Sequence, residues 1–120
     1  MVPKSGNRVP KLQISLSESE FAHAVGEALQ LELGASHRAT KTVMAWTGVS
    51  DRTARLWLHG SASPNGLHLI VLAAHCRPVL ATVLRIMGHD KIALAVDLEM
   101  VEGQLEMILE SIRRLRIRGT

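Results

Sequence analysis

Residues 47–60 are the part of the chain that most constrains its fold, because they predict a tight turn followed by a short capped helix. Gly48 tolerates a positive φ, so it can end a preceding helix and redirect the backbone. Ser50 can cap the next helix, because its hydroxyl can accept a hydrogen bond from an N–H group of the first turn. We expect an inward apolar side and an outward charged side: Val49, Ala54 and Trp57 within, and Asp51, Arg52 and Arg55 outside.

This segment resembles the phage-repressor/Cro-like (XRE) helix-turn-helix family. The resemblance rests on the tetrapeptide Thr47-Gly48-Val49-Ser50, on Trp57 near the end of the predicted helix, and on the exit from Gly60 to Pro64. It covers roughly residues 38–74 and departs from the family at Met44, where a small residue is usual. The region beyond His89 lies outside the family core. The resemblance implies a small transcriptional regulator, most often a repressor that blocks promoter access.

A short helix that is buried behind and cationic in front suits the major groove of double-stranded DNA. Arg52 is the first choice for a base contact, because a guanidinium can bind guanine O6 and N7 bidentately. Arg55 lies one turn further and either reads a second base or contacts a phosphate. Asp51 either stabilises the helix N-terminus, positions Arg55 or contacts cytosine N4.

Further DNA contacts are expected around the same turn. Ser50, Thr53 and Lys41 are candidate phosphate contacts, the last from near the N-terminus of the preceding helix, where backbone N–H groups attract anions. Leu56 either touches a thymine methyl group or is half-buried in the domain.

The composition favours an all-α fold, because the chain has one Phe, two Trp and no Tyr but many aliphatic residues. We expect a compact five-helix helix-turn-helix domain over residues 17–90. A Ser17-x-x-Glu20 capping box and a Leu16–Phe21 hydrophobic staple open the first helix, which Gly34 ends. The second and third helices are predicted over residues 39–46 and 51–59, with Val43 and Met44 buried.

The fourth predicted helix opens with Ser63 as N-cap and Pro64 at its first position. Apolar residues repeat along it at helical spacing: Leu67, Ile70, Val71 and Ala74. The fifth predicted helix starts at Pro78 and ends at Gly88.

Basic residues are concentrated in two parts of the chain. Residues 1–16 contain Lys4, Arg8 and Lys11 without an acid, and predict a flexible basic N-terminal arm that is either plainly disordered or contacts DNA. Residues 35–91 contain seven Lys and Arg against two Asp, whereas residues 17–34 contain four Glu and no base. This distribution is typical of a surface that binds a polyanion, although a solvated surface can also show it.

The last segment, residues 91–120, predicts an amphipathic C-terminal helix. Its apolar residues are spaced 4, 3, 4, 3, 4 and 3 apart: Leu94, Leu98, Val101, Leu105, Ile108, Ile112 and Leu115. This is the heptad pattern of a coiled coil over about three heptads, near the lower limit for such an interpretation. The stripe either packs on its own domain or joins two chains. We expect a dimerisation helix, since two-fold oligomers predominate and suit a palindromic operator.

Catalytic and metal-binding patterns are not expected. The six histidines and Cys76 have no zinc-finger or metalloprotease spacing, and there is no Gly-rich phosphate loop or nucleophile elbow. We therefore expect no enzyme activity, no metal and no cofactor, and no small-molecule ligand is evident. A single cysteine and the absence of a signal or membrane-spanning segment favour a cytoplasmic, nucleoid-associated protein.

From these features we expect a protein that binds double-stranded DNA in a sequence-specific manner and acts as a dimeric transcriptional regulator of the repressor type. Two alternatives stay open. One is a DNA-binding accessory or adaptor in recombination, partition, packaging or antitoxin action. The other is a helix-turn-helix module used for protein–protein interaction.

Overall fold

The computed structural model describes residues 15–119 as an all-helical chain, without strands in that range. The helices are α2 (Glu18–Leu33), α3 (His37–Thr47), α4 (Asp51–Leu58), α5 (Gly66–His75), α6 (Arg77–Ile86) and α7 (Asp90–Gly119). The expected all-α class is therefore confirmed. Lys4, Arg8 and Lys11 of the predicted N-terminal arm lie outside the described residues.

The helix ends follow local hydrogen bonding. Ser17 and Glu20 form the predicted capping box at the start of α2, where the Glu20 backbone N–H donates to Ser17 Oγ over 3.1 Å and the Ser17 N–H donates to Glu20 Oε1 over 2.9 Å. The Ser17 backbone N–H, and after it the Ser17 hydroxyl, lower the pKa of the Glu20 carboxyl, because hydrogen bonds to this carboxyl favour its charged form. Gly34 ends α2 with a φ of 79°. The expected start and end of this helix are confirmed.

The start of α5 differs from the expectation. Its N-cap is Asn65, whose side-chain oxygen accepts a hydrogen bond of 3.0 Å from the backbone N–H of His68, and the helix begins at Gly66. The prediction that Ser63 and Pro64 open this helix is wrong. Asn caps a helix as well as Ser does, and Pro64 is instead buried in the loop that precedes the cap.

The apolar repeat in α5 also fails to mark its buried face. Leu72 is fully buried, whereas Leu67 and Ile70 are 70% and 67% exposed. Almost the whole helix is apolar, so several helical frames fit its sequence equally well, and packing against the neighbouring helices selects one.

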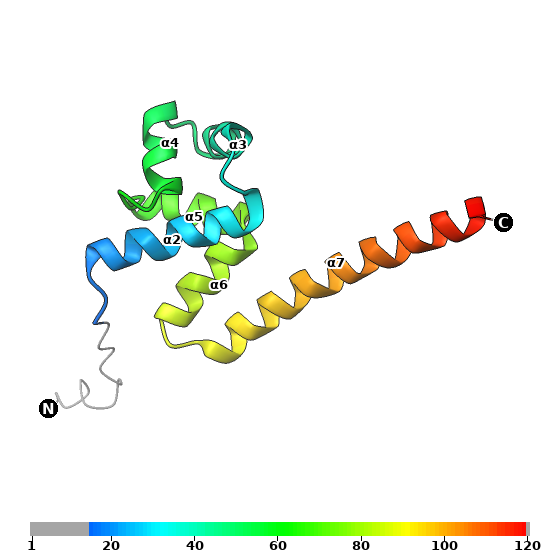
Figure 1. Ribbon diagram of the computed structural model, residues 1–120. Coiled ribbons are helices and arrows are strands. Elements are labelled where there is room, and N and C mark those ends of the chain that lie inside the picture. The colour runs from blue at the N-terminus through cyan, green and yellow to red at the C-terminus, as the bar shows by residue number, and fades with distance from the viewer. Residues whose placement is uncertain (1–14, 120) are drawn as a thin grey trace, which may run out of the picture.

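Residues 18–86 form the domain core, in which α2 packs against α3, α4 and α6, and α5 packs against α3 and α6 (Figure 1). The largest fully buried side chains come from α2, α3, α5, α6 and the junction between α5 and α6: Val25, Leu29, Val43, Leu72, Cys76 and Val79. Met44 is half-buried against this core, as is Phe21. Ala54, Trp57 and Leu58 of α4 belong to the same buried cluster, so the core holds both α3 and α4 in place.

The C-terminal helix α7 packs along α6 at its start and then projects from the domain (Figure 1). Ala93 is fully buried at this contact, and two ion pairs join the helices: Arg77–Glu99 at 2.9 Å and Arg85–Asp97. From residue 101 to residue 119 every side chain is exposed. In the part of the chain described, no helix is both long and apolar enough to cross a bilayer.

Candidate nucleic-acid interface

A three-residue turn joins α3 to α4. Gly48 adopts a left-handed conformation with a φ of 78°, and its N–H donates to the Met44 carbonyl over 2.7 Å. This is the conformation that glycine adopts without steric cost, so Gly48 both ends α3 and turns the chain. In Figure 1, α3 is seen nearly end-on whereas α4 stands upright, so the two helices cross steeply.

Ser50 holds the start of α4. Its Oγ accepts a hydrogen bond of 3.2 Å from the Thr53 backbone N–H, and its hydroxyl donates to Thr53 Oγ1 over 3.1 Å. Both hydroxyl groups are thus used to cap the helix, while Ser50 remains exposed. The remaining N–H groups of this first turn point out of the helix end, where they favour an anion.

The inner side of α4 is tightly buried. Ala54, Trp57 and Leu58 are each at most 4% exposed, and the Trp57 indole lies 5.3 Å from the His68 ring of α5, measured between centroids. Gln30 of α2 donates its side-chain amide to the Leu58 carbonyl at the C-terminal end of the helix. Burial and this hydrogen bond fix the orientation of α4, so its outer side presents a defined set of side chains.

The outer side of α4 carries the two arginines. Arg52 and Arg55 are both exposed, and an Arg55 guanidinium nitrogen lies 2.6 Å from Asp51 Oδ1 one turn earlier. Asp51 thus restricts the rotamers of Arg55, whereas within residues 15–119 no acidic side chain forms an ion pair with Arg52. Two cationic side chains, one held and one free to move, therefore face away from the core.

The other residues named from the sequence lie around these arginines. Lys41 is exposed on α3 and lines a shallow hollow together with Met44, Ala45 and Asp51. Lys41 therefore lies near the N-terminal end of α4, which begins at Asp51. Leu56 is half-buried and is less available to a ligand than the arginines.

Two further exposed residues belong to this surface and were not named from the sequence. His59 follows Arg55 by four residues and Arg52 by seven, so it extends the outer stripe of α4, and it lines a hollow with Arg55 and His37. Arg38 is exposed on α3, one turn before Lys41. The sequence could have indicated both residues. His59 has the helical spacing that places it on the same face as Arg52, and Arg38 has the i,i+3 spacing that places it on the same face as Lys41.

The opposite charge gathers on α2. Its four glutamates, all exposed, are unaccompanied by Lys or Arg: Glu18, Glu20, Glu27 and Glu32. The α3–α4 surface, by contrast, carries Arg38, Lys41, Arg52 and Arg55 against Asp51. A polyanion is therefore attracted to the α3–α4 side of the domain and repelled from α2.

Comparison of the chain with protein-family models, with curated proteins and with solved structures gives no match. The assignment of a function therefore depends on the geometry of the molecule. Among residues 15–119, no three His, Cys, Asp or Glu side chains come together in a way that could hold a metal ion. Cys76 is fully buried, and this burial raises the pKa of its thiol to about 11, so the thiol stays protonated near neutral pH.

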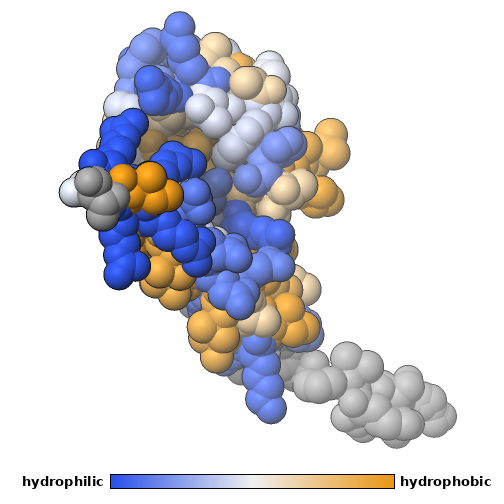
Figure 2. Space-filling view, turned by 90° about the vertical axis from the view of Figure 1, so that its right-hand side faces the viewer, coloured by the Kyte–Doolittle hydropathy of each residue, from blue (hydrophilic) through white to orange (hydrophobic). Residues whose placement is uncertain are grey.

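A second candidate surface lies on α7. All seven residues of the predicted dimerisation stripe are exposed, from 44% at Val101 to 67% at Leu115. Figure 2, which views the molecule from the side towards which α7 projects, shows hydrophobic side chains at the surface beside strongly hydrophilic ones. In the single chain, the domain does not cover this stripe.

Proposed function

We propose that this protein binds double-stranded DNA in a sequence-specific manner and acts as a dimeric transcriptional regulator of the repressor type. The observation that carries the proposal is the two-sided character of α4. Its inner side is locked into the core by Trp57 and Leu58, and its outer side presents two exposed arginines directly after a left-handed glycine turn. The resemblance of residues 38–74 to XRE helix-turn-helix proteins supports the same function.

In this proposal α4 is the recognition helix and enters the major groove. Arg52 reads a guanine, since a free guanidinium can reach O6 and N7 together. Arg55 reads a neighbouring base or binds a phosphate, with its position restricted by Asp51 at 2.6 Å. His59, at the end of the same outer stripe, contacts the edge of the site.

Phosphate contacts come from around the turn. The N-terminus of α4 and the exposed side chains of Ser50, Lys41 and Arg38 flank the recognition helix. Phosphate contacts of this kind fix the register of the protein on the duplex, whereas base contacts select the sequence. The acidic α2 faces away from the DNA in this arrangement, because its charge would be repelled.

In this proposal, α7 joins two chains into the dimer. Seven exposed apolar residues on one stripe of a 30-residue helix form a surface that burial against a second helix would stabilise. A two-fold dimer presents two recognition helices to half-sites roughly 34–36 Å apart, one turn of the duplex.

The exposed stripe also favours one second candidate function. An adaptor could bind DNA as a single domain and use α7 to recruit another protein, as in recombination, partition, packaging or antitoxin complexes. In that case the DNA site has no two-fold symmetry.

Selection of bound fragments from a random duplex library tests the proposal, at about 150 mM salt so that nonspecific phosphate binding is suppressed. We expect an enriched palindrome with half-sites one helical turn apart. Enrichment of a single half-site supports the adaptor. No enrichment, from protein that circular dichroism shows to be folded, contradicts both DNA-binding functions and leaves α7 as the surface for protein–protein interaction.

A further inference from the structure

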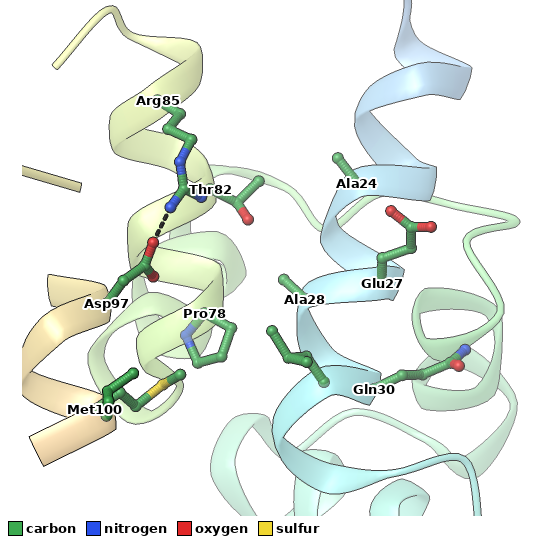
Figure 3. A pocket seen from close by; sticks show the side chains of 11 residues that line it. Ala24, Glu27, Ala28, Gln30, Pro78, Thr82, Arg85, Asp97 and Met100 are labelled. Atoms are coloured by element: carbon green, nitrogen blue, oxygen red, sulfur yellow. Dashed lines mark hydrogen bonds and ion pairs between the residues drawn. The ribbon is translucent and has the colours of Figure 1, made fainter. Parts of the chain in front are cut away.

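A groove of about 780 Å³ lies between α2 and the first half of α7, with α6 as its floor (Figure 3). Its α2 wall is formed by Ala24, Ala28 and Leu31, and Leu31 is 73% exposed. Pro78 and Thr82 form the floor, and Met100 and Val101 form the α7 wall. The groove is therefore largely apolar and open to solvent along its length.

The rim of the groove on the α2 side is acidic. Glu27 stands at this rim, between Ala24 and Ala28, and its side chain is 72% exposed, with His23 as an i,i+4 neighbour at 3.3 Å. The other three glutamates of α2 add to the negative charge along the same helix. On the α7 side, Arg85 and Asp97 neutralise each other through their ion pair.

The groove and the exposed stripe of α7 form one continuous surface. Val101 belongs to both, because it lines the groove and also occupies a position in the seven-residue stripe. A helix packed on the stripe therefore also lies over the groove. Such a helix would contact the α2 wall as well as the stripe.

Charge is divided along α7 in a way that specifies direction. Five acids occupy residues 97–110, without a base in residues 92–112. Four arginines follow, and residues 111–119 contain no acid: Arg113, Arg114, Arg116 and Arg118. A parallel pair of such helices would place the arginines beside arginines, whereas an antiparallel pair centred between Leu105 and Ile108 places them level with residues 95–100 of the other chain, which include Asp97 and Glu99.

We propose that the occupant of the groove is the C-terminal half of α7 from a second copy of this chain, running antiparallel to the first. This inference rests on the dimer of the proposed function and adds its direction and its contact with α2. In the heptad, Leu98, Leu105 and Ile112 occupy a positions, and the other four residues of the stripe occupy d positions. In the register that places a opposite d, Leu98 faces the partner's Leu115, Val101 faces the partner's Ile112 and Leu105 faces the partner's Ile108. The four arginines of the second copy then lie level with residues 95–100, beside the groove and Glu27 of α2.

This arrangement accounts for a stripe of only about three heptads, which is short for an independent two-stranded coiled coil. The groove supplies an additional apolar contact, and Glu27 of α2 adds an acid near the four arginines, of which Arg113 and Arg114 also lie 3.6 Å from Glu110 of their own helix. The same interaction occurs twice, because the two-fold axis passes between Leu105 and Ile108 and relates the two grooves.

Cross-linking of variants that each carry one added cysteine tests the direction. In the proposed register, residue 98 of one chain lies about 26 Å along the helix axis from residue 98 of the other, which exceeds the span of a disulfide. We expect Leu98→Cys alone to give little cross-linked dimer under mild oxidation, as should Leu115→Cys alone. An equimolar mixture of the two, carrying tags of different size, should give the mixed disulfide as the main product. The unsubstituted chain, with its buried Cys76, is the control.

Efficient cross-linking of Leu98→Cys to itself would show a parallel pair and overturn the proposal. So would a protein that sedimentation shows to be a monomer. Both measurements are made without DNA, so their outcome is separate from that of the library selection, which tests DNA binding.

A matched pair of substitutions tests the groove. Leu31 and Leu67 are similarly exposed, at 73% and 70%, but Leu31 lines the groove whereas Leu67 lies on α5 and is not among its lining residues. Leu31→Lys should weaken dimerisation about tenfold or more, measured by sedimentation equilibrium, because it buries a charge in an apolar contact beside the partner's arginines. Leu67→Lys should leave the dimer constant unchanged. Equal effects of the two substitutions would contradict the placement of the second helix in the groove.

Discussion

Gly26 of α2 and Gly60, just after α4, are in direct backbone contact: a Cβ atom on Gly26 would lie 2.9 Å from the Gly60 nitrogen and 2.9 Å from the Trp57 carbonyl oxygen. Gly60 in turn has a φ of 73°, and a Cβ there would lie 3.1 Å from the His23 Cα. These two glycines let α2 approach the end of α4 closely. Together with the Gln30–Leu58 hydrogen bond they position the proposed recognition helix.

Gly26→Ala should therefore destabilise the domain. The added methyl group meets backbone atoms, which cannot move aside as a flexible side chain can, so we expect a loss of about 1–3 kcal/mol in the free energy of unfolding. Urea denaturation followed by circular dichroism measures it. Gly103→Ala is the control: nothing lies within 4 Å of its Cβ position in the middle of α7, and removal of a helical glycine should stabilise by up to about 1 kcal/mol. A neutral Gly26→Ala would contradict the close contact.

The proposed division between base and phosphate contacts predicts two different DNA-binding defects. Arg52→Ala should relax the preference at one base pair of the selected site and cost about 1–3 kcal/mol there. Lys41→Ala should weaken binding to all sequences alike and make the dependence of affinity on salt less steep by about one charge. Titrations of matched and mismatched duplexes at several salt concentrations separate the two effects. Similar profiles for both variants would contradict the assignment.

The ion pair between Asp51 and Arg55 predicts a loss of selectivity when Asp51 is neutralised. Asp51→Asn should release Arg55 from its 2.6 Å contact and add net positive charge to the interface. We expect tighter binding to nonspecific duplexes and a smaller ratio of specific to nonspecific affinity. Exposed i,i+4 pairs stabilise a helix by only about 0.3–0.5 kcal/mol, so the unfolding midpoint should change little. If selectivity is unchanged, Asp51 acts only by stabilising the N-terminal end of α4.

The exposed stripe predicts that a charge at its centre abolishes dimerisation. Leu105→Asp should give a monomer by light scattering, because the aspartate would be buried in the helix pair. Leu105 is 54% exposed in the single chain, so the domain itself should remain folded. Met107→Asp is the control, because Met107 is 71% exposed but lies outside the stripe. A dimer that survives Leu105→Asp would place the interface elsewhere.

Burial of Cys76 predicts a pH dependence of stability at alkaline pH. Because the pKa of the thiol is raised from 9.0 to about 11, the folded state holds this proton more tightly than the unfolded state does. The stabilisation is complete below pH 9 and is lost as the pH rises towards 11, with a slope of up to about 1.4 kcal/mol per pH unit. Denaturant titrations between pH 8 and 11 should show this decline, and Cys76→Ala should show a shallower one. Parallel curves would mean that the thiol does not contribute.

Much of the fold follows from local features of the chain. The Ser17–Glu20 capping box, the Gly34 stop and the Gly48 turn each depend on hydrogen bonds or backbone angles within a few residues, and each is found where the sequence predicts it. The two sides of α4 were also predictable, since Ala54 and Trp57 share one helical face and Arg52 and Arg55 the other. The same reasoning failed for α5, because an almost wholly apolar helix offered no single face and because Asn65, rather than the predicted Ser63, caps it.

The sequence by itself thus determined the helical class, the turn before α4, the charged outer side of that helix and the apolar period of α7, because periodicity and capping are local properties. Only the tertiary structure decided which side of α5 is buried, that Gly26 and Gly60 meet and that a groove opens between α2 and α7. The tertiary structure also shows that the domain does not cover the apolar stripe of α7. These features depend on contacts between residues far apart in the chain, and such contacts are selected by the packing of the whole molecule.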